Sequence, residues 1–199
     1  MKAMILSAGY GKRLLPLTSK CPKPLLKIGR ETLLSNTIKF LKKFGVKQVI
    51  INVHYLGSMI NEYINKNNFN LDITIVKETD KILDTGGGIL NAIQHFSNEP
   101  FLAINPDTIW NLQYIKELRL MKKFFIENKQ SKCLLLLVKK NKSFDKSFKG
   151  DFSLNKNTIN RKIKDNLDYI YTGLQIIDPK ILLDLNEKVF SMNKIWDKL

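Results

Sequence analysis

The sequence has few of the residues that build disulfide frameworks or metal clusters. It contains two cysteines, Cys21 and Cys133, and two histidines among 199 residues. Two cysteines cannot form a disulfide framework or a zinc site by themselves. No apolar run approaches the ~20 residues of a membrane-spanning helix, and residues 1–6 lack the longer apolar stretch and cleavage site of a signal peptide. We therefore expect a cytoplasmic protein with no membrane partner.

Arginine is also scarce, although the chain is strongly basic. Of 33 Lys and Arg residues only four are arginine, and the formal net charge is +15. Direct readout of bases favours the arginine fork, whereas here lysines are spread along the whole chain. We expect a solvated lysine-rich surface that attracts small anionic substrates rather than nucleic acid. A basic nucleic-acid-binding module is the alternative from a different class.

Residues 1–104 alternate between strand-like and helix-like patterns. Strands are expected at 2–8, 47–53, 71–76 and 101–104, and helices at 33–44, 55–66 and 84–96. Thr32 is suited to cap the first helix and Gly45 to end it. Strands that alternate with helices are typical of a mostly parallel sheet covered on both faces.

The pattern changes after residue 111. A long amphipathic helix is expected at 112–127, a buried strand at 132–138, extended runs at 151–154, 158–163 and 169–177, and helical turns after Pro179. Nothing repeats and no linker divides the chain, so residues 1–199 are expected to form one domain. The predicted fold class is α/β, a three-layer sandwich with a Rossmann-like, mostly parallel mixed sheet. The later strands are expected to add a substrate-side lobe.

Residues 9–24 have the composition of a phosphate-binding loop at the end of the first strand. Gly9 and Gly11 let the backbone approach phosphate oxygens closely. Arg13, beside Lys12, can bind two oxygens at once, and Lys23 stands between two prolines that fix the local backbone. The loop is not a dinucleotide fingerprint, because a leucine replaces the third glycine, and no Gly-Lys-Ser/Thr follows as in a P-loop.

Two later segments contain further residues that could bind a nucleotide or a metal ion. Asp84-Thr85-Gly86-Gly87-Gly88 opens an expected helix, whose N-terminus favours anions, and its glycines clear room for a flat base or ribose. The alternative is a flexible loop with a helix cap. Asp107 follows the strand at 101–104 and is suited to ligate Mg²⁺, with a turn or helix cap as the alternative.

These segments together resemble the nucleotidyltransferases that make nucleoside-diphosphate sugars. The resemblance rests on Ala8-Gly9-Tyr10-Gly11-Lys12-Arg13 after an apolar strand, on Pro16-Leu17-Thr18, and on Pro22-Lys23-Pro24. Asp84 to Gly88 resembles the E-T-G-G-G segment of the N-acetylmuramate-1-phosphate uridylyltransferases, with aspartate replacing glutamate. Asn105-Pro106-Asp107 matches the family's N-G-D with proline replacing glycine, and Gly150-Asp151-Phe152 and Thr172-Gly173 match its G-D-F and S/T-G elements.

The resemblance implies a role for each matching residue. Arg13 and Lys23 are the implied catalytic residues, and Asp107 is the implied Mg²⁺ ligand. The implied nucleotide-binding residues are Ala8, Gly9, Gly11, Lys12, Arg13, Lys23, Asp84, Thr85, Gly86 and Asn105. The implied sugar-phosphate-binding residues are Gly150, Asp151, Thr172 and Gly173.

The expected reaction is nucleotidyl transfer from a nucleoside triphosphate, with UTP favoured, to a sugar-1-phosphate, with N-acetylmuramate-1-phosphate favoured. The attacking phosphate is already anionic, so positioning and charge neutralisation suffice. A mannose-1-phosphate guanylyltransferase, another hexose-1-phosphate nucleotidyltransferase and an inactive nucleotide-binding remnant are the alternatives.

The family usually continues past this point, with a second metal-ligating aspartate in a W-x-D-x-G-T-like segment. Trp196-Asp197-Lys198-Leu199 is not that segment and is expected in the preceding helix. The chain is therefore expected to lack the usual C-terminal end of the domain.

Overall fold

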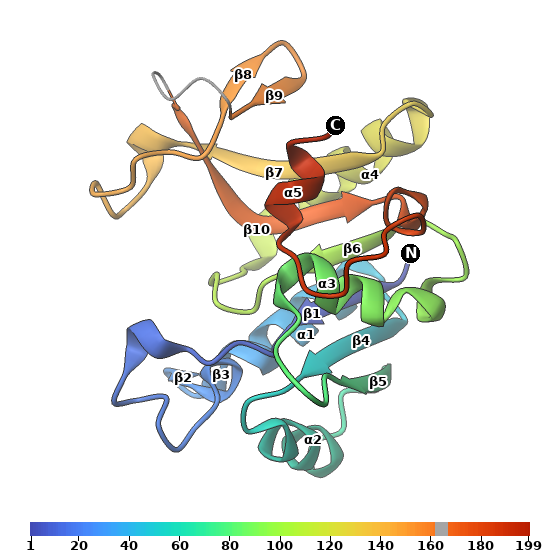
Figure 1. Ribbon diagram of the computed structural model, residues 1–199. Coiled ribbons are helices and arrows are strands. Elements are labelled where there is room, and N and C mark those ends of the chain that lie inside the picture. The colour runs from blue at the N-terminus through green and yellow to red at the C-terminus, as the bar shows by residue number, and fades with distance from the viewer. Residues whose placement is uncertain (162–166) are drawn as a thin grey trace.

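The computed structural model describes residues 1–161 and 167–199, and its centre is a six-stranded sheet (Figure 1). The strand order is β5–β4–β1–β6–β10–β7. The strands are β1 (Ala3–Leu6), β4 (Gln48–Val53), β5 (Asp72–Lys77), β6 (Phe101–Ile104), β7 (Cys133–Lys139) and β10 (Tyr169–Ile177). The first four pair in parallel, and β10 runs antiparallel to both β6 and β7. The predicted α/β class with a mostly parallel mixed sheet is confirmed.

Helices cover both faces of this sheet. One face packs against α1 (Leu33–Phe44), α2 (Gly57–Lys66) and α4 (Ile115–Glu127), and the other against α3 (Asp84–Asn91) and α5 (Met192–Trp196). Successive strand side chains alternate between the two cores: Ile5 joins the first, and Met4 joins the second. Burial on both faces explains why β1 and β6, in the middle of the sheet, are apolar throughout.

Several boundaries differ from the expected ones. The helix expected at 84–96 ends at Asn91, and a 3₁₀ turn (Ile93–Phe96) follows it. Likewise a 3₁₀ turn (Leu112–Tyr114) precedes α4, and another (Pro179–Leu182) accounts for the helical turns expected after Pro179. Further 3₁₀ turns lie at Lys12–Leu14, Lys23–Leu25 and Lys140–Lys142.

Two small hairpins stand apart from the central sheet. They are β2 (Lys27–Ile28) with β3 (Glu31–Thr32), which the pattern did not predict, and β8 (Ser153–Asn155) with β9 (Thr158–Asn160). The extended run expected at 158–163 is present to Asn160, and its residues 162 and 163 lie outside the described ones. Of the later strands, β7 and β10 join the main sheet, and β8 and β9 form a projecting hairpin (Figure 1). Within the described ranges, no helix is long and apolar enough to cross a membrane.

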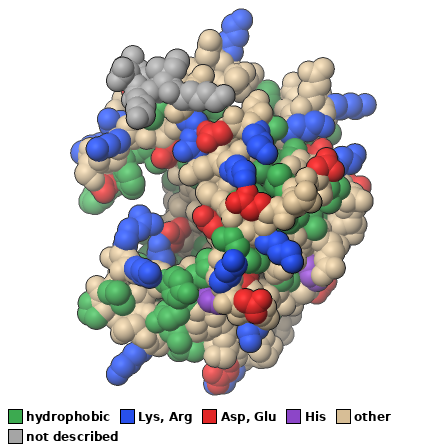
Figure 2. Space-filling view, viewed as in Figure 1, with side chains coloured by type: hydrophobic (Ala, Val, Ile, Leu, Met, Phe, Trp, Pro, Cys, Tyr) green, Lys and Arg blue, Asp and Glu red, His purple; other side chains and the backbone are tan. Residues whose placement is uncertain are grey.

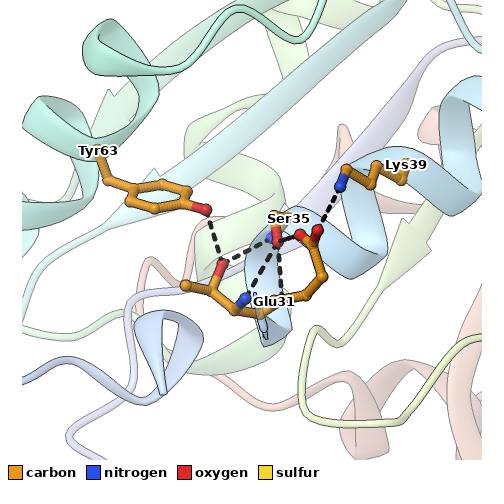
Figure 3. A network of polar contacts seen from close by, with 5 residues as sticks. Glu31, Ser35, Lys39 and Tyr63 are labelled. Carbon is orange, nitrogen blue, oxygen red and sulfur yellow. Dashed lines mark hydrogen bonds and ion pairs between the residues drawn. The ribbon is translucent and has the colours of Figure 1, made fainter. Parts of the chain in front are cut away.

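A capping box begins α1, as the sequence predicts for Thr32 (Figure 3). Thr32 Oγ1 accepts a hydrogen bond from Ser35 N at 3.0 Å and donates one to the Tyr63 hydroxyl oxygen at 3.1 Å. Ser35 Oγ accepts in return from Thr32 N and donates to Glu31. Hydrogen bonds from Lys39 and Ser35 hold the pKa of Glu31 below its ordinary value. The cap thus joins the start of α1 to α2 through Tyr63.

The glycines at the start of α3 allow a segment near the C-terminus to pack closely. Gly86 N and Gly87 N donate to Phe190 O at 2.9 and 3.0 Å. A Cβ at Gly86 would overlap the Phe190 ring, and one at Gly87 would overlap the carbonyl oxygen of Lys188. From the sequence, we expected the space beside these glycines to hold a base or ribose. In the structure, Phe190 and Lys188 fill it.

Replacing the cap residue tests the account of α1. We expect Thr32→Ala to lower the free energy of unfolding by about 1–2 kcal/mol, because Ser35 N loses its acceptor and the Tyr63 hydroxyl oxygen loses its donor. Urea unfolding measures the change. Thr79→Ala, at an exposed threonine, is the control and should leave the midpoint unchanged; equal effects of the two variants would contradict the capping role.

A second substitution tests the packing of α3. We expect Gly87→Ala to destabilise the protein by about 1–3 kcal/mol, because the methyl group forces the main chain at Lys188 to move. Gly9→Ala is the control, since a Cβ there meets no atom within 4 Å. Tryptophan fluorescence in urea compares the two, and a Gly87→Ala midpoint equal to that of Gly9→Ala would refute the packing role.

Candidate active site

One cavity of about 370 Å³ lies at the edge of the sheet where the parallel strands end. This is within the usual size range of small-molecule sites. Its lining residues are Leu6, Ser7, Ala8, Gly9, Gly11, Lys12, Arg13, Leu14, Lys23, Pro24, Asn52, Ile82, Asp84, Thr85, Asn105, Pro106 and Asp107. The face seen in Figure 2 is hollowed between the part that carries the first loop and the part that carries β8 and β9, and basic side chains stand at its rim.

The loop at residues 9–24 is held in place by hydrogen bonds that involve the buried Thr18. Gly11 has a φ of 66°, and a Cβ there would lie 2.9 Å from Thr18 Cγ2, so this position favours glycine. Thr18 is fully buried and donates from Oγ1 to Gly11 O at 3.0 Å. The Tyr55 hydroxyl donates to Thr18 O at 3.0 Å, which ties the loop to the turn after β4.

Cationic side chains project from this anchored loop. Lys12 and Arg13 are exposed, and Lys12 lies 5.2 Å from the centre of the Tyr10 ring. Among the described residues, no carboxylate forms an ion pair with Arg13, so its guanidinium is available to an anionic ligand. Lys23, held at the start of a 3₁₀ turn, forms an ion pair with Asp107 across the cavity.

The loop that carries Asp107 is fixed by a buried tryptophan. Trp110 is 2% exposed, its ring stacks on Phe40 of α1 at 5.5 Å, and its Nε1 donates to Asn105 O at 3.0 Å. Asn105 N donates to Gly173 O of β10 at 2.7 Å. These contacts place Asn105 and Asp107 in the cavity wall.

The start of α3 supplies the opposite wall. Asp84 has a φ of 62°, in the left-handed region, and its Oδ1 accepts from Thr85 N at 2.6 Å. Aspartate tolerates this region better than most residues because its short side chain bonds locally. Thr85 Oγ1 accepts from Met192 N at 2.9 Å, so the wall is also tied to the start of α5.

The two carboxylates in the cavity lining, Asp84 and Asp107, are enough for a metal ion whose other ligands are phosphate oxygens and water. The described ranges contain no group of three or more His, Cys, Asp or Glu residues that could hold a metal ion. Asp107 and Asp84 both line the cavity. Magnesium is commonly bound through one or two carboxylates together with phosphates and water, and Asp107 meets that requirement.

The structure brings together most of the residues implied by the resemblance, but not all. Gly86 packs against Phe190 and does not line the cavity. Gly150, Asp151, Thr172 and Gly173 also lie outside the lining. Asp151 Oδ2 accepts from Tyr171 N at 2.9 Å, and Thr172 O accepts from the Thr108 hydroxyl at 2.7 Å. Thr172 and Gly173 therefore support the loop of Asn105 and Asp107 from β10.

Sequence reasoning missed some of the lining, above all Asn52 of β4. Asn52 is 2% exposed, and its Oδ1 accepts from Ser7 N at 2.9 Å. The available signal was an amide side chain directly after the apolar run at residues 49–51, two residues before His54. Ser7, Leu14, Pro24 and Ile82 also line the cavity. Leu14 and Pro24 belong to the predicted loop at 9–24 but were not named as binding residues, and no pattern in the sequence marked Ile82.

Several known proteins are similar to this chain in sequence or in fold. Residues 2–148 match a family model described as nucleotidyl transferase. The chain is 35% identical over 115 residues to the N-acetylmuramate alpha-1-phosphate uridylyltransferase of Neisseria meningitidis, a match that covers 57% of this chain and 50% of that protein. A protein of the same name from Caulobacter vibrioides is 27% identical over 203 residues, covering 99% and 83%. The mannose-1-phosphate guanyltransferase beta-B of Xenopus laevis is 35% identical over 117 residues, covering 57% and 32%.

The chain thus spans half of the Neisseria relative and about a third of the Xenopus relative. Among solved structures, HddC from Yersinia pseudotuberculosis superposes with a TM-score of 0.74 at 26% identity, covering 96% of this chain and 82% of that one. The inositol-1-phosphate CTP transferase from T. maritima has a TM-score of 0.80 at 18% identity, covering 99% and 80%, and shows the shared fold. The family match includes the loop at 9–24, the start of α3 and Asp107, and the chain belongs to the nucleotidyl transferase family.

Proposed function

We propose that this protein transfers a nucleotidyl group from a nucleoside triphosphate to a sugar-1-phosphate and releases pyrophosphate. The observation that carries the proposal is the convergence of Lys12, Arg13 and Lys23 with Asp107 on one cavity. Three cations beside the Asp107 carboxylate, with the Asp84 carboxylate also in the lining, suit a polyphosphate with a metal ion. Family membership supports the same reaction class.

The reaction needs positioning and charge neutralisation more than acid–base chemistry. The phosphate oxygen of the sugar-1-phosphate attacks the α-phosphorus, the bond to the β-phosphate oxygen breaks, and pyrophosphate leaves with that electron pair. Arg13, free of a carboxylate partner among the described residues, binds phosphate oxygens in a forked geometry. Lys23 neutralises charge that develops at the reacting centre. Bound Mg²⁺ would supply further charge neutralisation, and Asp107 is the residue that would hold it.

For the substrates, we propose UTP and N-acetylmuramate-1-phosphate. Two relatives that carry this activity in their names support the choice, and one of them aligns with 99% of the chain. GTP with mannose-1-phosphate is the second candidate, supported by the Xenopus relative and by the solved complex of HddC with GMP-PN.

A substrate matrix tests the reaction. Four nucleoside triphosphates are combined with several sugar-1-phosphates in the presence of Mg²⁺, and pyrophosphate release is measured. We expect the fastest release with UTP and N-acetylmuramate-1-phosphate, and a loss of about 10²–10³-fold in Asp107→Asn, because a charged ligand of the phosphate-bound metal is removed. Asp184→Asn, at an exposed aspartate outside the cavity, is the matched control.

The outcomes of the matrix separate the candidates. Fastest release with GTP and mannose-1-phosphate would replace the proposed substrates by the second candidate. Release in no combination, together with salt-sensitive binding of DNA or RNA, would overturn the enzyme proposal in favour of a nucleic-acid-binding module.

The ion pair between Lys23 and Asp107 allows a test that does not depend on turnover. In Lys23→Met the Asp107 carboxylate loses its cationic partner, so we expect Mn²⁺ to bind about 3- to 10-fold more tightly in the absence of nucleotide. Calorimetric titration with Mn²⁺ measures this affinity. Lys20→Met, at an exposed lysine of the same loop, is the control, and an unchanged affinity in Lys23→Met would show that Lys23 does not compete with the metal.

A further inference from the structure

A buried carboxylate with no role in the mechanism above lies next to the cavity. Glu78, directly after β5, is 1% exposed and does not belong to the cavity lining. In the part of the chain that the structure describes, no Lys, Arg or His side chain forms an ion pair with it. A buried charge is costly unless hydrogen bonds compensate it, so the bonds that Glu78 accepts indicate what it does.

The first of these bonds holds the start of α3. Glu78 Oε2 accepts from Leu83 N at 2.8 Å and so closes the loop at residues 79–82. Leu83 directly precedes Asp84 and Thr85, which line the cavity. On its other side, Leu83 O accepts from Phe190 N at 3.2 Å. The entry into α3 is therefore held between Glu78 and the segment before α5.

The second bond reaches the first loop through Asn52. Glu78 Oε1 accepts from Asn52 Nδ2 at 2.7 Å, and Asn52 Oδ1 accepts from Ser7 N at 2.9 Å. Because Nδ2 donates to Glu78, the amide of Asn52 must present its oxygen to Ser7. Ser7 directly precedes Ala8 and Gly9, and the chain of bonds therefore connects the ends of β5, β4 and β1.

Helix α3 packs directly against the side chains of Glu78 and Asn52. A Cβ at Gly88 of α3 would lie 2.7 Å from both Glu78 Oε1 and Asn52 Nδ2. The third glycine of the Gly86-Gly87-Gly88 run thus lets α3 rest directly on the pair. Any change in the geometry of Glu78 and Asn52 is transmitted to α3 because the two are in contact.

We propose that Glu78 is a positioning residue for the nucleotide. Its two oxygens set, at the same time, the start of α3 and, through Asn52, the first residues of the phosphate-binding loop, so the spacing between the two cavity walls depends on one side chain. This inference rests on the proposed function, since it assumes that the cavity binds a nucleoside triphosphate.

A carboxylate suits this position because both of its oxygens must accept. Glutamine offers one acceptor, and its amide nitrogen would then face either Leu83 N–H or the amide group of Asn52, both of which are donors. Turning Asn52 over would satisfy glutamine but would leave Ser7 N–H facing another donor. Glutamine at position 78 combined with aspartate at position 52 would restore every bond. The new amide would donate to the new carboxylate, whose other oxygen would still accept from Ser7 N.

The experiment is a double-substitution cycle of Glu78→Gln, Asn52→Asp and the combined variant. UTP affinity is measured by calorimetry, and KM for UTP, KM for the sugar phosphate and kcat are measured where turnover occurs. We expect Glu78→Gln to weaken UTP binding about 10-fold, with kcat and the KM for the sugar phosphate changed less than about 3-fold. The combined variant should recover most of the affinity, whereas Asn52→Asp alone should lose it, because two carboxylates then face each other.

Glu99→Gln, at an exposed glutamate, is the matched control, and urea midpoints confirm that every variant is compared in its folded form. A lowered midpoint with unchanged UTP affinity in Glu78→Gln would overturn the positioning role and leave a structural one. Failure of the combined variant to regain affinity would also overturn it. If the unsubstituted protein binds none of the four nucleoside triphosphates, the proposed function falls with it, which distinguishes the two failures.

Discussion

Parallel pairing of β1 with β4 and β6, and of β4 with β5, brings the carboxyl ends of four strands to one edge of the sheet. Parallel strands require crossover connections, and each crossover leaves the same edge, so four loops must share the space above it. The cavity is made by this convergence, and its residues come from the ends of β1, β4 and β6 and from the start of α3. The rest of the chain supports these loops.

Long-range support comes from both helical layers. On one face, Trp110 rests on Phe40 of α1 and fixes the loop of Asn105 and Asp107. On the other face, Phe190 O, just before α5, accepts from the start of α3, and Met192 N, at the start of α5, donates to Thr85. Residues far apart in the sequence thus position the two carboxylates that line the cavity, Asp84 and Asp107.

Local features of this structure could be predicted from the sequence, because they depend on neighbours in the chain. The cap at Thr32, the end of α1 at Gly45 and the parallel strands follow from hydrogen-bonding groups and apolar periodicity within a few residues. Residues of the loop at 9–24, Asp84 and Asp107, which the sequence singled out as candidate site residues, line one cavity; their roles in binding stay a prediction.

The features that sequence reasoning missed depend on contacts between distant segments. The glycines of α3 were interpreted as room for a ligand, since nothing in the local pattern points to Phe190 or Lys188. Glu78 and Asn52 likewise gave no local signal of their pairing. The predicted helix at 84–96 is interrupted after Asn91, a boundary that periodicity alone does not locate.

The anchoring of Trp110 means that the two sides of the cavity differ in stiffness. The wall that carries Asn105 and Asp107 stands on a buried aromatic stack, whereas residues 12–17 of the first loop are exposed, with Leu15 at 59% and Leu17 at 66%. Exposed segments with few buried contacts lie at the low end of local stability. Binding of the proposed polyphosphate substrate would therefore order mainly one side of the cavity, and the conformational entropy lost on binding would be concentrated in that first loop.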